Sequence, residues 1–89
     1  MGDESGLVGQ DVVLDTRGPL VYIGRLARID EHFYEVQDVD VHDMLESQTT
    51  KERYVLEARK FGVKKNRRSV LVRKAEVVSL SRLEDVIEY

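Results

Sequence analysis

The sequence of 89 residues contains no cysteine, no tryptophan and one proline. Without cysteine the chain has neither disulfide bonds nor thiolate metal sites, which fits a reducing compartment. No apolar run approaches the about 20 residues that a membrane-spanning helix needs. Residues 1–6 (MGDESG) are polar and acidic, unlike a signal peptide. We therefore expect a single small cytoplasmic domain without a membrane segment.

The net charge of −3 is unevenly distributed along the chain. Residues 1–45 carry three arginines and ten acidic residues, whereas residues 46–74 carry ten basic and three acidic residues. Residues 75–89 are again acidic, with one arginine and four acidic residues. The basic middle can bind an anion, or it can pair with the acidic flanks of the same or a neighbouring subunit. Partner subunits are the main remaining source of extra stability for so small a domain.

Alternating hydrophobicity predicts three strands in the first half of the chain, over residues 11–16, 20–29 and 33–41. Neither side of the second strand is purely polar. Gly24 lies in its interior, which is typical of a bend, a bulge or a close approach of another backbone. A strongly bent strand that serves both sides of a small barrel would explain this mixed pattern.

The hydrophobic period changes to that of a helix over Thr50–Phe61. Thr49 and Glu52 have the spacing of a capping box at its start. Gly62 lies where a helix C-cap is expected. Along the helix, one predicted face contains Tyr54, Ala58 and Phe61.

Two further short strands are predicted over residues 69–72 and 76–80, after a basic loop. The chain then has five strands, with one helix between the third and the fourth. Strands of this length and spacing predict a mostly β fold, a small and strongly bent barrel.

Three features resemble the Sm/LSm family, whose bacterial relatives include Hfq. The stretch LVGQDVVLDTRGPLVYIGRLARIDEHF (7–33) is similar to the first Sm motif, with Gly18 at a turn, Gly24 within a strand and an Ile-Asp pair ending at Asp30. The stretch VLVRKAEVVSLS (70–81) is similar to the second motif. The third feature is the insertion between strands three and four, where the family tolerates one.

The resemblance implies one five-stranded Sm-like barrel over residues 7–89, with a helical insertion at about 46–62 and a flexible segment at 1–6. The N-terminal helix usual in this family would be reduced to at most one turn near Asp3–Val8. The resemblance also implies a homo-oligomeric ring that assembles through edge strands four and five, with RNA at loops facing its central pore.

The chain departs from the family at two positions that matter for RNA. Members that bind RNA usually have a Met-Asn pair where this chain has Phe33 and Tyr34. The second motif usually has Arg-Gly where this chain has Arg73 and Lys74. His32 or Tyr34 could instead stack on a base.

We predict a site for single-stranded RNA at these loops, in which cations contact phosphates and planar groups contact bases. Its residues are Asp30, His32, Tyr34, Arg73 and Lys74. In the structural alternative, Asp30 caps a turn, Tyr34 packs in the core and Arg73 pairs with Asp30.

A basic run is a second candidate for nucleic-acid contact, through Lys60, Lys64, Lys65, Arg67, Arg68, Arg73 and Lys74. Phosphate contacts by these cations would be sensitive to salt. The alternative is a solvated loop without a ligand, because no aromatic residue is interleaved with the cations.

Other chemistry has little support. Asp38, Asp40 and His42 share one predicted strand face and could contact a divalent ion, but a solvent-facing acidic edge is the alternative. The chain has no glycine-rich phosphate loop and no evident nucleophile–base pair. We therefore predict no enzyme activity, no catalytic residues, no metal and no other cofactor.

The sequence thus predicts an Sm-like homo-oligomer that binds single-stranded RNA. The alternative is a non-catalytic assembly module that has lost RNA binding. In that case the predicted helix face that contains Tyr54 would bind a protein partner.

Overall fold

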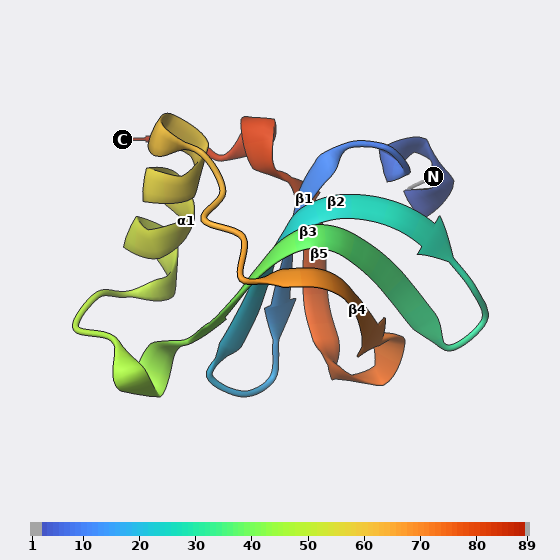
Figure 1. Cartoon of the computed structure of the whole chain (residues 1–89), viewed down its shortest axis with the longest axis horizontal. Coiled ribbons are helices and arrows are strands. Elements are labelled where there is room, and N and C mark those ends of the chain that lie inside the picture. The colour runs from blue at the N-terminus through green and yellow to red at the C-terminus, as the bar shows by residue number, and fades with distance from the viewer. Residues whose placement is uncertain (1–2, 89) are drawn as a thin grey trace.

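One antiparallel sheet of five strands dominates the computed structural model, which describes residues 3–88 (Figure 1). The strands are β1 (Asp11–Thr16), β2 (Leu20–Ile29), β3 (Phe33–Asp43), β4 (Arg67–Arg73) and β5 (Val77–Arg82). Their order in the sheet is β4-β3-β2-β1-β5, so β4 and β5 are its edges. The predicted mostly β architecture, with one helix between the third and fourth strands, is confirmed.

Five helical segments accompany the sheet. These are η1 (Glu4–Leu7), η2 (Met44–Glu46), α1 (Lys51–Phe61), η3 (Lys74–Glu76) and η4 (Leu83–Asp85), of which all but α1 are short 3-10 turns. No helix formed by residues 3–88 has the length and the hydrophobicity to cross a membrane.

The predicted bounds of β1 and β2 are confirmed, and those of the other strands need correction. β3 continues past residue 41 to Asp43, and β4 extends beyond 69–72 at both ends. β5 begins at Val77 rather than at residue 76, because residues 74–76 form η3.

The N-terminal segment contains a single turn, as expected. Asp3 caps η1, and its carboxylate accepts a hydrogen bond of 2.9 Å from the Ser5 amide. This hydrogen bond lowers the pKa of Asp3. Flexibility over residues 1–6 stays a prediction, and residues 1 and 2 lie outside the described part of the chain.

The helix α1 begins one residue later than the capping-box spacing suggested. Thr50, not Thr49, is the N-cap, and its hydroxyl accepts a hydrogen bond of 3.1 Å from the Arg53 amide. The predicted C-cap is confirmed, since Gly62 has φ +97° and its amide donates to the Ala58 carbonyl. Glycine suits this conformation because it has no Cβ.

Gly24 lies at an irregularity between β2 and β3, which confirms the predicted bulge and close approach. Ile23 pairs with Asp40 and Arg25 with Gln37, so two residues of β3 lie opposite Gly24. One of them, Asp38, has a positive φ of 48°. The Arg25 guanidinium donates to the side chains of Asp38 (2.9 Å) and Gln37 (2.8 Å), which holds the bulge together.

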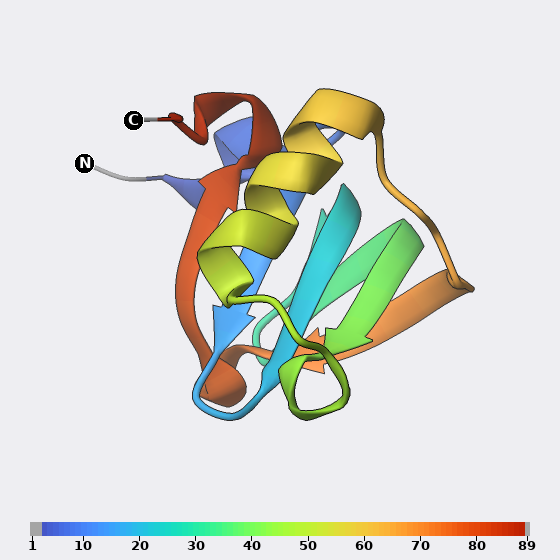
Figure 2. The same cartoon turned by 90° about the vertical axis from the view of Figure 1, so that its left-hand side faces the viewer.

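Two hydrophobic clusters cover the two faces of the sheet. The inner cluster contains Val12, Leu14, Leu26, Tyr34, Val36, Val39 and Val72. The outer cluster contains Val13, Val21, Ile23, Val55, Ala58 and Leu83. It forms where α1 lies across the sheet (Figure 2). β2 has apolar side chains on both faces because one face contributes to the inner cluster and α1 and η4 bury the other. Strand bending alone does not account for this pattern.

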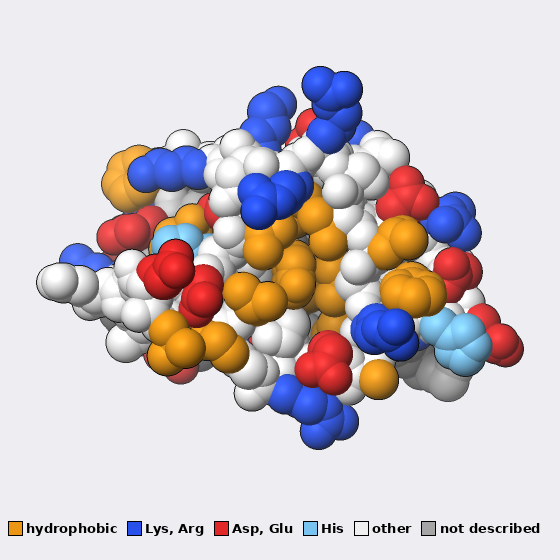
Figure 3. Space-filling model, turned by 60° about the horizontal axis from the view of Figure 1, so that its bottom comes forward, with side chains coloured by type: hydrophobic (Ala, Val, Ile, Leu, Met, Phe, Trp, Pro, Cys, Tyr) orange, Lys and Arg blue, Asp and Glu red, His pale blue; other side chains and the backbone are white. Residues whose placement is uncertain are grey.

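The edges of the sheet remain open. Val70 of β4 and Leu80 of β5 pack against the inner cluster but are only partly buried. Leu71 and Val78 on the same two strands are 55% and 58% exposed. Figure 3 shows hydrophobic side chains gathered at the centre of one face of the molecule, with charged side chains around them.

Candidate nucleic-acid interface

Asp30 builds the turn between β2 and β3. Its carboxylate accepts hydrogen bonds from the amides of His32 (2.9 Å) and Phe33 (2.8 Å). These two bonds, with that from His32 the larger effect, hold the pKa of Asp30 below its usual value. The structural alternative for this residue is therefore present in the fold: Asp30 caps the turn.

The turn between β4 and β5 lies directly beside the Asp30 turn. Phe33 is opposite Arg73 in the β3–β4 register. The Lys74 amide donates a hydrogen bond of 2.9 Å to the His32 carbonyl. The fold thus brings together the predicted loop residues from two segments that lie far apart in the sequence. We call these residues the loop cluster: Asp30, His32, Tyr34, Arg73 and Lys74.

The two cations of this loop cluster have different surroundings. The Arg73 guanidinium lies 5.5 Å from the centre of the Phe33 ring, a cation–π contact. No acidic side chain among residues 3–88 lies within ion-pair distance of Arg73, so the pair with Asp30 that the structural alternative predicted is not formed. Instead, Asp30 lies 3.5 Å from the Arg28 guanidinium. Arg73 is exposed and free to contact an anion.

Lys74 is partly engaged within the protein. Its ammonium lies 5.3 Å from the centre of the Tyr34 ring and 3.3 Å from a carboxylate oxygen of Glu4. The same carboxylate accepts a hydrogen bond of 2.7 Å from the Tyr34 hydroxyl. Sequence analysis did not find Glu4, and it had no signal to do so, because 30 positions separate the residue from Tyr34.

Tyr34 belongs to the core rather than to the surface. Its side chain is 7% exposed, and it packs in the inner cluster. Burial, and then the hydrogen bond to Glu4, raise its pKa to about 12. His32 is the accessible planar side chain of the loop cluster, since its ring is 77% exposed. Base stacking at this site is therefore better served by His32 than by Tyr34.

The fold divides the predicted basic run between the two ends of β4, and Lys60 lies apart from both in α1, where it pairs with Glu88 at 2.7 Å. Arg67 is opposite Val39, whereas Arg73 is opposite Phe33, so a whole strand separates the two groups of cations. Lys64 and Lys65 precede β4, and Arg67 and Arg68 begin it. We call these four residues the basic segment. The fold does not join them to the loop cluster.

The segment DVDVHD is not a solvent-facing acidic edge. The bulge at Asp38 interrupts the alternation, and Asp38 pairs with Arg25. Asp40 is 3% exposed, and its carboxylate accepts hydrogen bonds from the Tyr54 hydroxyl and from the side-chain amide of Asn66. His42 stacks on the Tyr54 ring with centroids 3.8 Å apart. Within residues 3–88, no group of three potential ligands is placed to hold a metal ion.

The helix face predicted for a protein partner largely packs on the sheet. Ala58 is buried in the outer cluster, and Tyr54 is partly buried against it. Burial, followed by the hydrogen bond to Asp40, raises the pKa of Tyr54. Only Phe61, which is 79% exposed, remains on the surface.

The fold is similar to a solved structure of the Sm protein of Pyrococcus abyssii in complex with a uridine heptamer. The two share 18% sequence identity with a TM-score of 0.60, over 88% of this chain and 89% of that chain. This chain has the Sm fold. No family model and no curated protein matches its sequence.

The Sm fold explains where the two motif-like stretches lie. Residues 7–33 form β1, β2 and the Asp30 turn, and residues 70–81 form most of β4, η3 and β5. The last residues of the first stretch and Arg73 of the second therefore meet at one end of the sheet.

Proposed function

We propose that this protein is an Sm-like RNA-binding protein that contacts single-stranded RNA with its loop cluster. The observation that carries the proposal is the junction of the two turns, which brings exposed His32 and exposed Arg73 to adjacent turns at one end of the sheet. The solved Sm protein of similar fold is in complex with a uridine heptamer, which supports the same ligand class here.

Each residue of the cluster has a separate role in this proposal. Arg73 contacts phosphate, because no carboxylate of the described chain neutralises it. His32 stacks on a base, since a planar side chain at an exposed turn offers its face to any base. Asp30 holds the turn that carries His32, and Lys74 adds positive potential beside it. RNA binding in this proposal requires neither a catalytic step nor a cofactor.

The proposal includes assembly of identical copies through β4 and β5. Both strands are edges, and both present exposed apolar side chains at Leu71 and Val78. An exposed apolar edge strand is a ready surface for adding a further strand. Pairing of β4 with β5 of another copy would place several loop clusters in one assembly, which increases avidity for a long RNA.

An assembly module without RNA binding is the second candidate function. It shares the open edges, but the burial of Ala58 and the partial burial of Tyr54 leave Phe61 as the exposed residue of the predicted helix face. A cytoplasmic location stays a prediction.

Fluorescence anisotropy with labelled uridine-rich and adenosine-rich RNA, at low and at physiological salt, tests the RNA proposal. We expect binding that persists at physiological salt and weakens on the order of tenfold for Arg73→Ala, because one charged phosphate contact is lost. Arg68→Ala, at the other end of β4, is the matched control and should bind as the wild type does.

Three results would contradict the loop site. Binding that responds to Arg68→Ala and not to Arg73→Ala would place RNA on the basic segment. Binding only at low salt would indicate nonspecific charge attraction. No binding to either RNA would favour the assembly module.

Light scattering tests the assembly. We expect the wild type to form an oligomer and Val78→Pro to form a monomer, because proline removes a backbone donor from the edge of β5. Val78→Ala keeps that donor and is the control. An unchanged mass for Val78→Pro, with a circular dichroism spectrum of the wild type, would exclude this edge as the interface.

A further inference from the structure

The basic segment has charges without partners in its own chain. Among the described residues, no acidic side chain lies within ion-pair distance of Lys64, Lys65, Arg67 or Arg68, whereas ten other ion pairs are present. The segment is nevertheless held in place by Asn66, whose backbone amide donates a hydrogen bond of 2.9 Å to the Val39 carbonyl. The side-chain amide of Asn66 accepts a hydrogen bond from the backbone amide of Val41 and donates one to its carbonyl. These bonds fix the backbone at Asn66, and the four exposed cations flank it at the start of an edge strand.

The end of the other edge strand is acidic. η4 follows β5 directly, and the buried Leu83 fixes it to the outer cluster. The carboxylates of Glu84 and Asp85 are 71% and 56% exposed. Arg82 lies 3.4 Å from the first and 3.1 Å from the second, so one cation faces two acids. The local charge is therefore negative.

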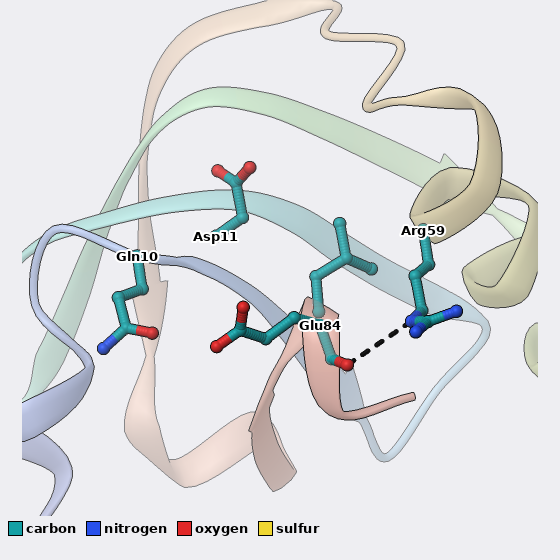
Figure 4. Close-up of a pocket in the computed structure, with 5 residues that line it drawn as sticks. Gln10, Asp11, Arg59 and Glu84 are labelled. Atoms are coloured by element: carbon teal, nitrogen blue, oxygen red, sulfur yellow. Dashed lines mark hydrogen bonds between the residues drawn. The ribbon is translucent and has the colours of Figure 1, made fainter. Parts of the chain in front are cut away.

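A shallow hollow beside η4 adds another acid to this end. It is lined by Gln10, Asp11, Arg59, Leu83 and Glu84 (Figure 4). Arg59 donates a hydrogen bond of 3.3 Å to the carbonyl oxygen of Glu84. The carboxylate of Glu84 points away from Arg59, toward Gln10 (Figure 4). Arg59 therefore does not pair with the Glu84 carboxylate, whose ion-pair partner within the described chain is Arg82.

Strand direction decides whether the two charged ends meet. Every pair in this sheet is antiparallel. If β4 of a second copy joins β5 in the same way, its first residues lie beside the last residues of β5 and the start of η4. Parallel addition would instead place Arg73 and Lys74 beside η4 and the basic segment beside the start of β5, where Glu76 is the nearby acid. Charge complementarity favours the antiparallel arrangement.

We infer that the basic segment of one copy binds the acidic η4 of the next copy, with Lys64 and Lys65 facing Glu84 and Asp85. This inference rests on the proposed assembly through β4 and β5, and it assigns the basic segment to a protein contact rather than to RNA. Opposite charges at the rim of an interface set the register and direction of the added strand. They also make the assembly sensitive to salt.

A charge swap tests the inference. The variants are Lys64→Glu with Lys65→Glu, Glu84→Lys with Asp85→Lys, and all four changes together. We expect each pair of changes to raise the dissociation constant of the assembly on the order of tenfold at low salt, since attraction becomes repulsion. The fourfold variant should regain most of the affinity of the wild type. Sedimentation equilibrium measures all three, with circular dichroism as the check on folding.

The outcomes separate this inference from the assembly itself. If Val78→Pro breaks the oligomer but neither charge-reversed pair weakens it, only the electrostatic contact is wrong. If the fourfold variant is no better than the weaker pair, the two groups do not face one another. If Lys64→Glu with Lys65→Glu keeps its mass but loses RNA, the segment is an RNA surface. A monomeric wild type would overturn both the assembly and the contact.

Discussion

A tyrosine donates its hydroxyl to a carboxylate on each face of the sheet, and the two pairs differ in the burial of the acid. Toward the inner face, Tyr34 bonds Glu4, whose side chain is 38% exposed. On the outer face, Tyr54 bonds Asp40, which is 3% exposed. Water can replace Tyr34 as a partner for Glu4, but it has little access to Asp40.

This difference indicates how the two helical segments are held. η1 adds a half-exposed contact to an inner cluster that is already complete in the strands. α1 completes the outer cluster, and its polar network includes Tyr54, Asn66 and the stacked His42. A buried polar group that has one specific set of partners favours one docking position of the helix.

Gly24→Ala should have the largest effect, because the bulge beside Gly24 directs Val39 inward and Asp40 outward, toward Tyr54. An added Cβ would lie 2.8 Å from the Val39 Cα and 3.0 Å from the Gln37 carbonyl oxygen. The strands must separate to relieve these contacts. We expect a loss of about 3 kcal/mol in the free energy of unfolding, measured by urea denaturation.

Gly18→Ala is the matched control, since no atom lies within 4 Å of the position of its added Cβ. Its stability should differ little from that of the wild type. Equal stabilities for the two alanine variants would show that β2 and β3 do not approach as closely as described.

Tyr54→Phe should have the next largest effect. The change removes the hydroxyl donor and leaves the buried Asp40 with the Asn66 amide, at 3.3 Å, as its side-chain partner. We expect the free energy of unfolding to fall by about 2 kcal/mol. Tyr34→Phe should cost less than about 1 kcal/mol, because water can solvate Glu4. Parallel thermal and urea denaturation of both variants would show this order, and the reverse order would contradict the comparison.

Glu4→Gln should have the smallest effect on stability, below about 0.5 kcal/mol, because the carboxylate is well solvated. It should nevertheless lower the pKa of Tyr34 from about 12, while burial keeps that pKa above the usual 10.0. Ultraviolet absorbance during alkaline titration measures this shift. An unchanged pKa would mean that Glu4 does not accept the Tyr34 hydroxyl.

We also expect the stability difference between the wild type and Glu4→Gln to depend on pH. The hydrogen bond from Tyr34 holds the pKa of Glu4 below its usual value in the folded protein. The contribution of Glu4 to stability is therefore present above about 4.3, the usual unfolded value, and it is lost as the pH falls through the lower folded value. The stabilities of wild type and Glu4→Gln should converge in strong acid, as measured by urea denaturation across pH.

The sequence was sufficient for local structure that depends on neighbours along the chain. The spacing of apolar residues predicted β1, β2 and the helix, and Gly24 predicted the bulge. The motif-like stretches predicted the Sm fold because they combine strand pattern with glycines at particular turns. They also placed Asp30 and Arg73 at adjacent loops, which the structure confirms.

The sequence could not predict features that depend on the extra residue of a β-bulge or on a partner that is distant in the chain. Strict alternation placed Asp38 and Asp40 on one exposed face, but the positive φ of Asp38 makes Asp40 a buried acceptor. The capping-box spacing favoured Thr49, although the adjacent Thr50 is the actual cap.

The number of strands and the position of the insertion follow from the sequence, because periodicity and turn residues act over a few positions. Only the tertiary structure decided that α1 covers the second face of β2, that Tyr34 is buried beside Glu4, and that the two groups of cations lie at opposite ends of β4. These features arise from packing between segments that are distant in the chain. The physical reason is that side-chain burial depends on which surfaces meet in three dimensions, and no local pattern specifies that.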